Sequence, residues 1–375
     1  MNKIKGIIIF FVIPLYAYAG GFGEIIIDWK AYLNPEGKYE VVFEPTPLNP
    51  YNWEIKGVKG FNEFELKRAL IGYRTGLNEN HSVEIAVRVE NINGTGINAY
   101  LDRAFIKLDY PEHLNMDFSL GYIQNPWLAW TRGKLWEYEG MEIQFSEFLG
   151  ILERSELGAV FGFGFKNYGA HLDFNFGIGS AEQSGEGIER YSAQLEWGVS
   201  QLDILLDGIL AYSIQGEQKN SGYQELWQAG IAGQYDRVKV GGEYLQGRGW
   251  INAEEVYILG NFPKGFADYL YGVGRVFPEG REIKFQGWSL VSELRILERL
   301  KLVYRYDFFD PTARFNDDRE NLNIVGLIFE LGPEVLLGIS YQTQDFQSYN
   351  FPDGDDQAEI EPIESITFHL QAKIP

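Results

Sequence analysis

The sequence has no cysteine and, beyond its N-terminal region, no long apolar run. A membrane-spanning helix needs about 20 consecutive apolar residues, and here a charge or a glycine interrupts every run within a few residues. Helical membrane proteins are therefore excluded. Small secreted domains that depend on disulfides are excluded as well, because such domains are rich in cysteine.

Positive charge is also scarce. The chain carries 32 lysine and arginine residues against 53 aspartate and glutamate residues, a net charge of −21 at pH 7. A nucleic-acid-binding protein needs a basic surface, so this class is excluded. The four histidines have no matching serine and acid in the pattern, and no G-x-S-x-G motif appears, which argues against an enzyme built on a barrel. They are His81, His113, His171 and His369.

The N-terminus has the features of a secretory signal peptide. Lys3 and Lys5 precede a short apolar run over 6–15, and Ala17-Tyr18-Ala19 forms a small-x-small cleavage site. We expect residues 1–19 to be removed on export. Residues 20–375 then form a single domain.

The mature chain is rich in aromatic residues (15%) and in glycine (43 residues), and apolar and polar residues alternate in many segments. In 300–308, for example, leucine, tyrosine and phenylalanine alternate with Lys301, Arg305 and Asp307. A period of two is typical of β-strands that have one apolar face. The pattern predicts sixteen strands, at about 24–33, 61–75, 81–90, 98–110, 114–124, 155–165, 168–178, 188–199, 202–212, 224–236, 238–247, 285–297, 300–309, 321–331, 334–345 and 364–374.

The connections between these segments alternate between short and long. The short ones have about one to four residues, whereas the long ones include 34–60, 125–154, 248–284 and 346–363. This rhythm is typical of outer-membrane barrels, which have short periplasmic turns and long extracellular loops. We therefore predict an all-β transmembrane antiparallel barrel of about 16 strands in the outer membrane, surrounded by lipid and enclosing an aqueous lumen. Outward-facing girdles are expected from Trp197, Tyr212, Trp227, Tyr235, Tyr244, Trp288, Tyr304, Tyr306 and Tyr341.

Five short motifs occur in order along the chain: 64–69 (FELKRA), 101–106 (LDRAFI), 120–126 (LGYIQNP), 154–158 (RSELG) and 302–307 (LVYRYD). Together they resemble the phosphate-selective porin O and P family, although the family's Arg-Asp order is reversed at Asp102-Arg103. The resemblance implies a trimeric, sixteen-stranded channel for ions or small solutes, without a cofactor, whose third long loop folds into the pore.

The face opposite the apolar one should line the lumen, and we expect it to be polar with mixed charge. The alternative is that individual charges only pair with one another on a solvated wall. The basic candidates are Arg88, Arg103, Lys107, Lys239, Arg295, Lys301, Arg305 and Lys373. The acidic candidates are Glu84, Glu90, Asp109, Asp117, Asp173, Glu196, Asp203, Asp207, Glu243, Glu293 and Asp307.

The third long connection, 125–154, is the candidate constriction. Arg132 and Lys134 within it could attract anions, and its tryptophans could seat it against the barrel wall. Part of it, at 141–149, also alternates weakly and could belong to a strand. In the last long loop, Asp353, Asp355 and Asp356 could bind a divalent cation, although a solvated acidic loop is favoured.

Two alternatives to a general porin remain open. One is a secreted soluble β-rich binding protein, whose exposed aromatic residues would bind sugars. The other is a substrate-specific outer-membrane channel for an organic solute or a hydrocarbon, which a continuous apolar lumen face would favour.

Overall fold

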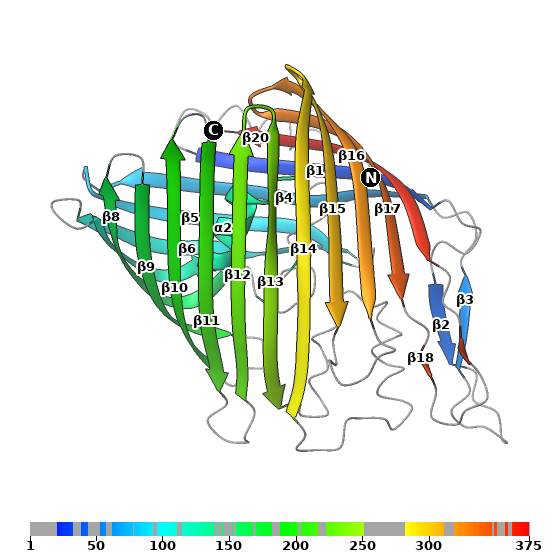
Figure 1. Cartoon of the computed structure of the whole chain (residues 1–375), viewed down its shortest axis with the longest axis horizontal. Helices are drawn as coiled ribbons and strands as arrows, with labels where there is room; N and C mark the ends of the chain where they lie inside the picture. The colour runs from blue at the N-terminus through cyan, green and yellow to red at the C-terminus, as the bar shows by residue number, and fades with distance from the viewer. Residues whose placement is uncertain are drawn as a thin grey trace.

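The chain forms one closed antiparallel barrel of sixteen strands (Figure 1). The computed structural model describes residues 21–32, 39–43, 53–57, 62–77, 79–92, 96–110, 115–138, 141, 145, 152, 155–167, 170–181, 188–201, 204–216, 223–250, 282–310, 319–346, 349–350, 357–358 and 362–374. The barrel strands are β1 (Gly21–Tyr32), β4 (Asn62–Gly76), β5 (His81–Ile92), β6 (Gly96–Tyr110), β7 (Asn115–Gln124), β8 (Ser155–Asn167), β9 (Ala170–Ala181), β10 (Ile188–Gln201), β11 (Ile204–Gly216), β12 (Tyr223–Tyr235), β13 (Val238–Trp250), β14 (Glu282–Leu297), β15 (Leu300–Asp310), β16 (Glu320–Gly332), β17 (Val335–Phe346) and β20 (Ile363–Ile374).

Each barrel strand pairs with the next one along the chain, and β1 closes the ring by pairing with both β4 and β20. Gly23 lies opposite Ile374, so both ends of the barrel sequence lie at the end with the short turns. The predicted fold class is confirmed, and each predicted segment overlaps one strand. Individual boundaries differ by up to four residues, as at β11, which starts at Ile204 and ends at Gly216.

Three elements lie outside the predicted strands. Two small hairpins, β2 (Tyr39–Phe43) with β3 (Trp53–Gly57) and β18 (Tyr349–Asn350) with β19 (Gln357–Ala358), interrupt long connections. A helix, α2 (Pro126–Lys134), follows β7 directly. Within the described part of the chain, no helix is long and apolar enough to cross a lipid bilayer.

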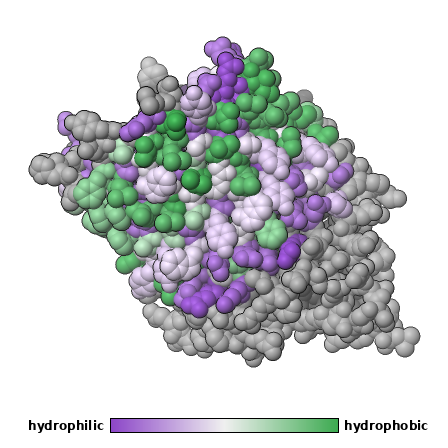
Figure 2. All heavy atoms as spheres, in the orientation of Figure 1, coloured by the Kyte–Doolittle hydropathy of each residue, from purple (hydrophilic) through white to green (hydrophobic). Residues whose placement is uncertain are grey.

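The two faces of the barrel wall differ as the alternation predicts. On β15, Leu302 and Tyr304 are exposed on the outside. Lys301, Val303 and Arg305, which alternate with them, are buried on the inside. Figure 2 shows hydrophobic and intermediate residues spread over much of the outer wall. A barrel in lipid requires such an outer face. Trp227, Tyr235, Tyr244, Tyr304 and Tyr341 are exposed large side chains of this face.

The turn between β12 and β13 uses a residue that tolerates tight backbone geometry. Between β12 and β13 the chain reverses over two residues, Asp236 and Arg237, and Asp236 has a φ of 49°. Aspartate is among the few non-glycine residues that adopt this left-handed conformation readily. Because these turns leave no slack, the register of each hairpin is fixed, and so is the set of side chains that faces the lumen.

Candidate functional site

The described residues 125–138, 141 and 145, which we call the inner segment, follow the end of β7. The Asn125 side chain caps α2, accepting a hydrogen bond of 3.0 Å from the backbone nitrogen of Trp127, and Pro126 occupies the first helical position. Both residues are typical of a helix start. The Asn125 amide also donates to Glu156 of β8 at 3.0 Å. The start of α2 is therefore fixed to the inner wall of the barrel.

The inner segment lies inside the barrel, as Figure 1 shows for α2. Its large side chains are at most 6% exposed and belong to one apolar cluster with inward-facing residues of β11–β16. The prediction of a polar inward face is therefore wrong over these strands, where apolar residues cover part of the wall. Met141 lies in a turn and Phe145 in a helical conformation, so the predicted strand at 141–149 is wrong at these two positions. The buried side chains of the segment are Trp127, Leu128, Trp130, Leu135, Trp136, Tyr138, Met141 and Phe145.

Inward-facing glycines receive these large side chains. A Cβ atom at Gly230 of β12 would lie 2.6 Å from the Trp130 ring. A Cβ atom at Gly241 of β13 would lie 2.5 Å from Leu135 Cδ2. Contacts this short do not occur between real atoms, so the wall has to be bare at these points. The same relationship joins Phe145 to Gly287 and Met141 to Gly326.

Hydrogen bonds fix the orientation of the inner segment against the barrel wall. The Trp127 indole donates to Glu243 of β13 at 3.1 Å, and the amide of Gln342 on β17 donates to the Met141 carbonyl at 2.7 Å. Buried polar groups that are satisfied in this way specify a single arrangement of the chain. The segment is thus held by strands on several sides of the barrel.

Lys301 of β15 anchors the described residues that directly follow α2 and end at Tyr138. Its ammonium lies 2.8 Å from Glu330 Oε1, 3.2 Å from Glu293 Oε1 and 3.7 Å from Glu137 Oε1. It also donates to the Tyr138 hydroxyl at 3.3 Å, and that hydroxyl donates to Glu293. Burial, and then the Glu293 carboxylate, raise the pKa of Tyr138 well above its ordinary value, so the phenol keeps its proton.

Arg305, also on β15, lies beneath the same stretch and is 1% exposed. Its guanidinium binds both carboxylate oxygens of Asp307, with Nε 2.9 Å from each. It also lies 5.4 Å from the centre of the Trp136 ring, a cation–π geometry. Lys301 and Arg305 therefore hold the inner segment in place, and neither presents a free charge to the lumen.

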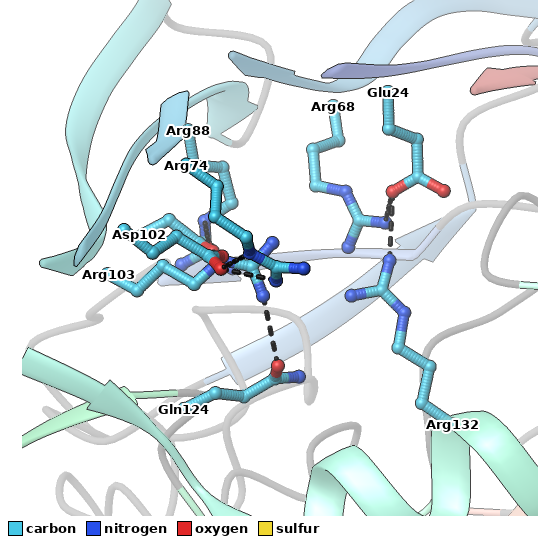
Figure 3. Close-up of polar contacts among 9 residues, drawn as sticks. Glu24, Arg68, Arg74, Arg88, Asp102, Arg103, Gln124 and Arg132 are labelled. Atoms are coloured by element: carbon cyan, nitrogen blue, oxygen red, sulfur yellow. Dashed lines mark hydrogen bonds and ion pairs between the residues drawn. The ribbon is translucent and has the colours of Figure 1, made fainter. Parts of the chain in front are cut away.

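A cluster of arginines faces the other side of α2 (Figure 3). Glu24 of β1 accepts from Arg68 of β4 and, at 2.9 Å, from Arg132 of α2. Gln371 of β20 donates to its second oxygen at 2.9 Å. One carboxylate thus joins the helix to three strands of the barrel wall.

The second half of the cluster lies on β4, β5 and β6. Glu84 binds Arg74 and, at 2.8 Å, the Nε of Arg103. Asp102 lies 3.7 Å from both Arg88 and Arg103. A register shift between Ala86 and Val87 places two consecutive residues, Asp102 and Arg103, toward the interior. This bulge lies at the reversed Asp-Arg pair of the sequence.

We call Arg68, Arg74, Arg88, Arg103 and Arg132 the arginine cluster. Their described carboxylate partners are Glu24, Glu84 and Asp102. Five guanidinium groups thus gather on one part of the inner wall. The Arg74 side chain is 63% exposed, so solvent reaches the cluster.

Carboxylates gather on β9–β11. Lys134 of α2 lies 3.0 Å from Asp207 of β11, and His171 Nε2 lies 3.6 Å from Glu196 and 4.0 Å from Asp207. Asp173 pairs in register with Glu196. Arg132 and Lys134, two residues apart on α2, therefore meet different walls: one reaches the arginine cluster and the other reaches these carboxylates.

No family model matches the chain, and no curated protein matches it. Solved structures do. An anion-selective porin from Comamonas acidovorans superposes with a TM-score of 0.57 at 11% identity, over 94% of this chain and 98% of that one. The Salmonella typhi OmpF complex with daunomycin gives a TM-score of 0.59 at 10% identity, over 94% and 96%. A trimer form of OmpT from Vibrio cholerae gives 0.52 at 10% identity, over 94% and 98%.

This chain has the porin fold. At such low identities the likeness extends to the sixteen-stranded outer-membrane barrel and not to one porin family. Membership of the phosphate-selective family stays a prediction.

The remaining predicted pore-lining residues lie apart from the arginine cluster. Lys107 pairs with Asp109 at 3.0 Å, and both side chains are about two-fifths exposed. Lys239 is half-buried beside a small cavity that Lys134 also lines. Arg295 is exposed at the short-turn end of β14, where its backbone nitrogen donates to the Arg237 carbonyl at 2.8 Å. Asp353, Asp355 and Asp356 lie outside the described residues, as does Asp203.

Sequence reasoning missed Glu24, Arg68, Arg74 and Asp102 as inward-facing residues. The alternation on β4 contained the signal, because Arg68, Leu70, Gly72 and Arg74 share one face and Ile71 and Tyr73 share the other. Asp102 could not be found in this way, because the bulge breaks the period of two.

The sequence pattern did not show that His369 has a serine beside it. Its Nε2 lies 2.8 Å from the Ser340 hydroxyl, across β17 and β20. These side chains are 6% and 1% exposed, so a substrate has no room at the hydroxyl. The pair is a buried hydrogen bond of the barrel wall.

Proposed function

We propose that this protein is an outer-membrane channel through which small hydrophilic solutes and ions diffuse passively, with a preference for anions. The observation that carries the preference is the gathering of five guanidinium groups in the arginine cluster, next to α2. A charged wall beside a narrowed lumen concentrates ions of the opposite sign. The inner segment supplies the narrowing, because it fills the barrel on the side of β11–β17.

Phosphate is the anion that this geometry would retain longest. A guanidinium binds phosphate oxygens through two parallel hydrogen bonds, and five guanidinium groups lie within one cluster. Glu24, Glu84 and Asp102 already occupy part of this capacity. We therefore propose that phosphate binds weakly to the cluster and reduces the chloride current while it is bound. We do not propose a tight phosphate site.

The test is a planar-bilayer measurement on the purified, folded protein under a salt gradient. We expect stepwise openings whose reversal potential lies toward the chloride equilibrium potential, and a chloride current that phosphate reduces. A reversal potential toward the cation would overturn the anion preference and leave the channel. No openings from folded protein would overturn the channel itself.

The assembly proposed for this chain is a homotrimer. The support is the sixteen-stranded porin fold together with the trimer form of the similar OmpT structure. Cross-linking in native membranes tests it: a ladder that ends at three chains is expected, and a ladder that ends at one chain would contradict it.

For export, we propose that residues 1–19 are removed before the barrel assembles. The first residues of the mature protein, read by N-terminal sequencing from isolated outer membranes, should then be Gly20 and Gly21. An intact Met1 in the membrane-inserted protein would contradict this.

A further inference from the structure

Phe22 of β1 places an aromatic ring inside the arginine cluster. Its side chain is half-buried and lies on the same face of the strand as Glu24, which binds Arg68 and Arg132. The ring lies against Gly72 of β4, its partner in register, where a Cβ atom would be 2.6 Å from Cε2 and 2.7 Å from Cε1 of the ring. The wall therefore has to be bare at Gly72 for the ring to lie there.

Two guanidinium groups lie over this ring. The Cζ atom of Arg74 is 5.8 Å from the ring centre, and the Cζ atom of Arg103 is 5.3 Å from it. Both distances are within the range of cation–π contacts. Arg74 is on β4 and Arg103 is on β6, so the ring joins two strands that are not neighbours in the barrel.

Glu84 of β5 binds the same two arginines. One of its carboxylate oxygens accepts from Arg74, and the other lies 2.8 Å from Arg103 Nε. Gln124, at the end of β7, accepts a hydrogen bond of 3.1 Å from Arg103 Nη1 (Figure 3). Among the described residues, none contacts Nη1 of Arg74 or Nη2 of Arg103. Each guanidinium group therefore keeps donors that a solute can use.

The ring restricts the arginines without neutralising them. An arginine side chain has many rotamers, and a bidentate contact with an oxyanion needs its N–H donors in a fixed direction. A further carboxylate would also hold the guanidinium groups, but it would cancel their charge and occupy their donors. An aromatic ring attracts a cation through its quadrupole and carries no charge of its own, so the positive charge of the pair is kept.

We propose that Phe22 positions Arg74 and Arg103 as a pair, and that this pair is the place in the arginine cluster where an oxyanion such as phosphate is held. The inference rests on the proposed function and separates its two parts. The preference for anions over cations follows from the charge of the cluster, which Phe22 does not change. The retention of an oxyanion relative to chloride follows from the direction of the donors, because chloride is spherical and needs no bidentate contact.

Block of the chloride current by inorganic phosphate, measured in a planar bilayer, tests this role. Phe22→Leu removes the ring but no charge. It should raise the half-blocking phosphate concentration at least about fivefold, the effect of losing two exposed cation–π contacts. Gly72→Ala keeps the ring but displaces it from the wall, and should act in the same direction. Because both changes act through one ring, the double variant should match Phe22→Leu alone. The reversal potential in a potassium chloride gradient should stay unchanged in all three variants.

The matched control is Tyr100→Leu, which removes a ring 5.0 Å from the Arg88 guanidinium and should leave the half-blocking concentration unchanged. If Phe22→Leu does not fold, Gly72→Ala decides the question. An unchanged half-blocking concentration in Phe22→Leu, or an equal rise in the control, overturns the inference and leaves the proposed function standing. A shifted reversal potential in Phe22→Leu also overturns it, because the ring would then act on charge selection. A channel that phosphate does not block in any variant overturns the phosphate part of the proposed function together with this inference.

Discussion

The indole ring of Trp130 on α2 lies directly over Gly230 on β12. A Cβ atom at Gly230 would be 2.6 Å from Cζ3 of the ring and 2.9 Å from Cγ2 of Ile209. Trp130 and Ile209 thus both approach a point where β12 has no side chain of its own. The position of α2 in the lumen depends on this fit, because a methyl group at Gly230 would overlap the ring.

Gly230→Ala should displace the inner segment. We expect a loss of stability of about 1–3 kcal/mol, typical of an overpacked core, and a broader distribution of single-channel conductances. Gly233→Ala in the same strand has space for its methyl group and serves as the control. Urea unfolding in micelles and bilayer recordings give the two measurements. Equal behaviour of the two variants would show that α2 does not depend on the bare wall.

Trp127→Phe keeps the aromatic ring but removes the hydrogen bond to Glu243. The carboxylate, 6% exposed, then loses the indole donor, and we expect a loss of stability of about 1–3 kcal/mol. The same change at Trp227, which is 58% exposed on the outer face, provides the control. Comparison of the two urea midpoints checks the prediction, which fails if Trp227→Phe is the more destabilising.

Lys301→Met should be the most destabilising of these changes. Its removal leaves Glu293 and Glu330 close together without their cation, and breaking a buried ion pair from one side costs about 3 kcal/mol or more. Lys107→Met removes a lysine whose one described ion pair is two-fifths exposed, and should cost under about 1 kcal/mol. Equilibrium unfolding of both variants, followed by far-UV circular dichroism, separates them. Dichroism is preferred because fluorescence would respond to the local change around Tyr138. Similar midpoints would refute the anchoring role of Lys301.

The barrel could be predicted because lipid imposes a strict rule on the sequence. Every second residue of β15 has to be apolar, so the alternation over 300–308 shows at once where the strand lies and which face is outside. The short connections then set the direction of each strand. The hairpin β2–β3 was not predicted as part of the fold, because it lies outside the barrel and this rule does not act on it.

The inner face follows no such rule, which is why the site was predicted less well. Water, a packed helix and a paired charge all occur there, so Leu245 and Glu243 appear on the same face of β13. The cap Asn125-Pro126 signals a helix start in the sequence, but not that the helix turns inward. The partners of Arg132 could not be predicted either, because Glu24 is 108 residues away and meets it only when the ring closes.

Glu24→Gln should increase the anion preference of the channel. The amide keeps the shape of the side chain and an acceptor for Arg68 and Arg132, but the cluster gains one net positive charge. A unit charge at roughly 10 Å in water is worth about 0.4 kcal/mol, which favours chloride about twofold and disfavours potassium about twofold, so the chloride-to-potassium permeability ratio should rise about fourfold. The reversal potential in a salt gradient measures this ratio.

Glu225→Gln removes a carboxylate that pairs with the exposed Arg248, away from the cluster, and should leave the ratio unchanged. The rise should also shrink between 0.1 M and 1 M salt, because the screening length falls from about 10 Å to about 3 Å. An equal rise in both variants would assign the preference to the total charge of the protein, and an unchanged ratio in Glu24→Gln would remove the arginine cluster from the ion path.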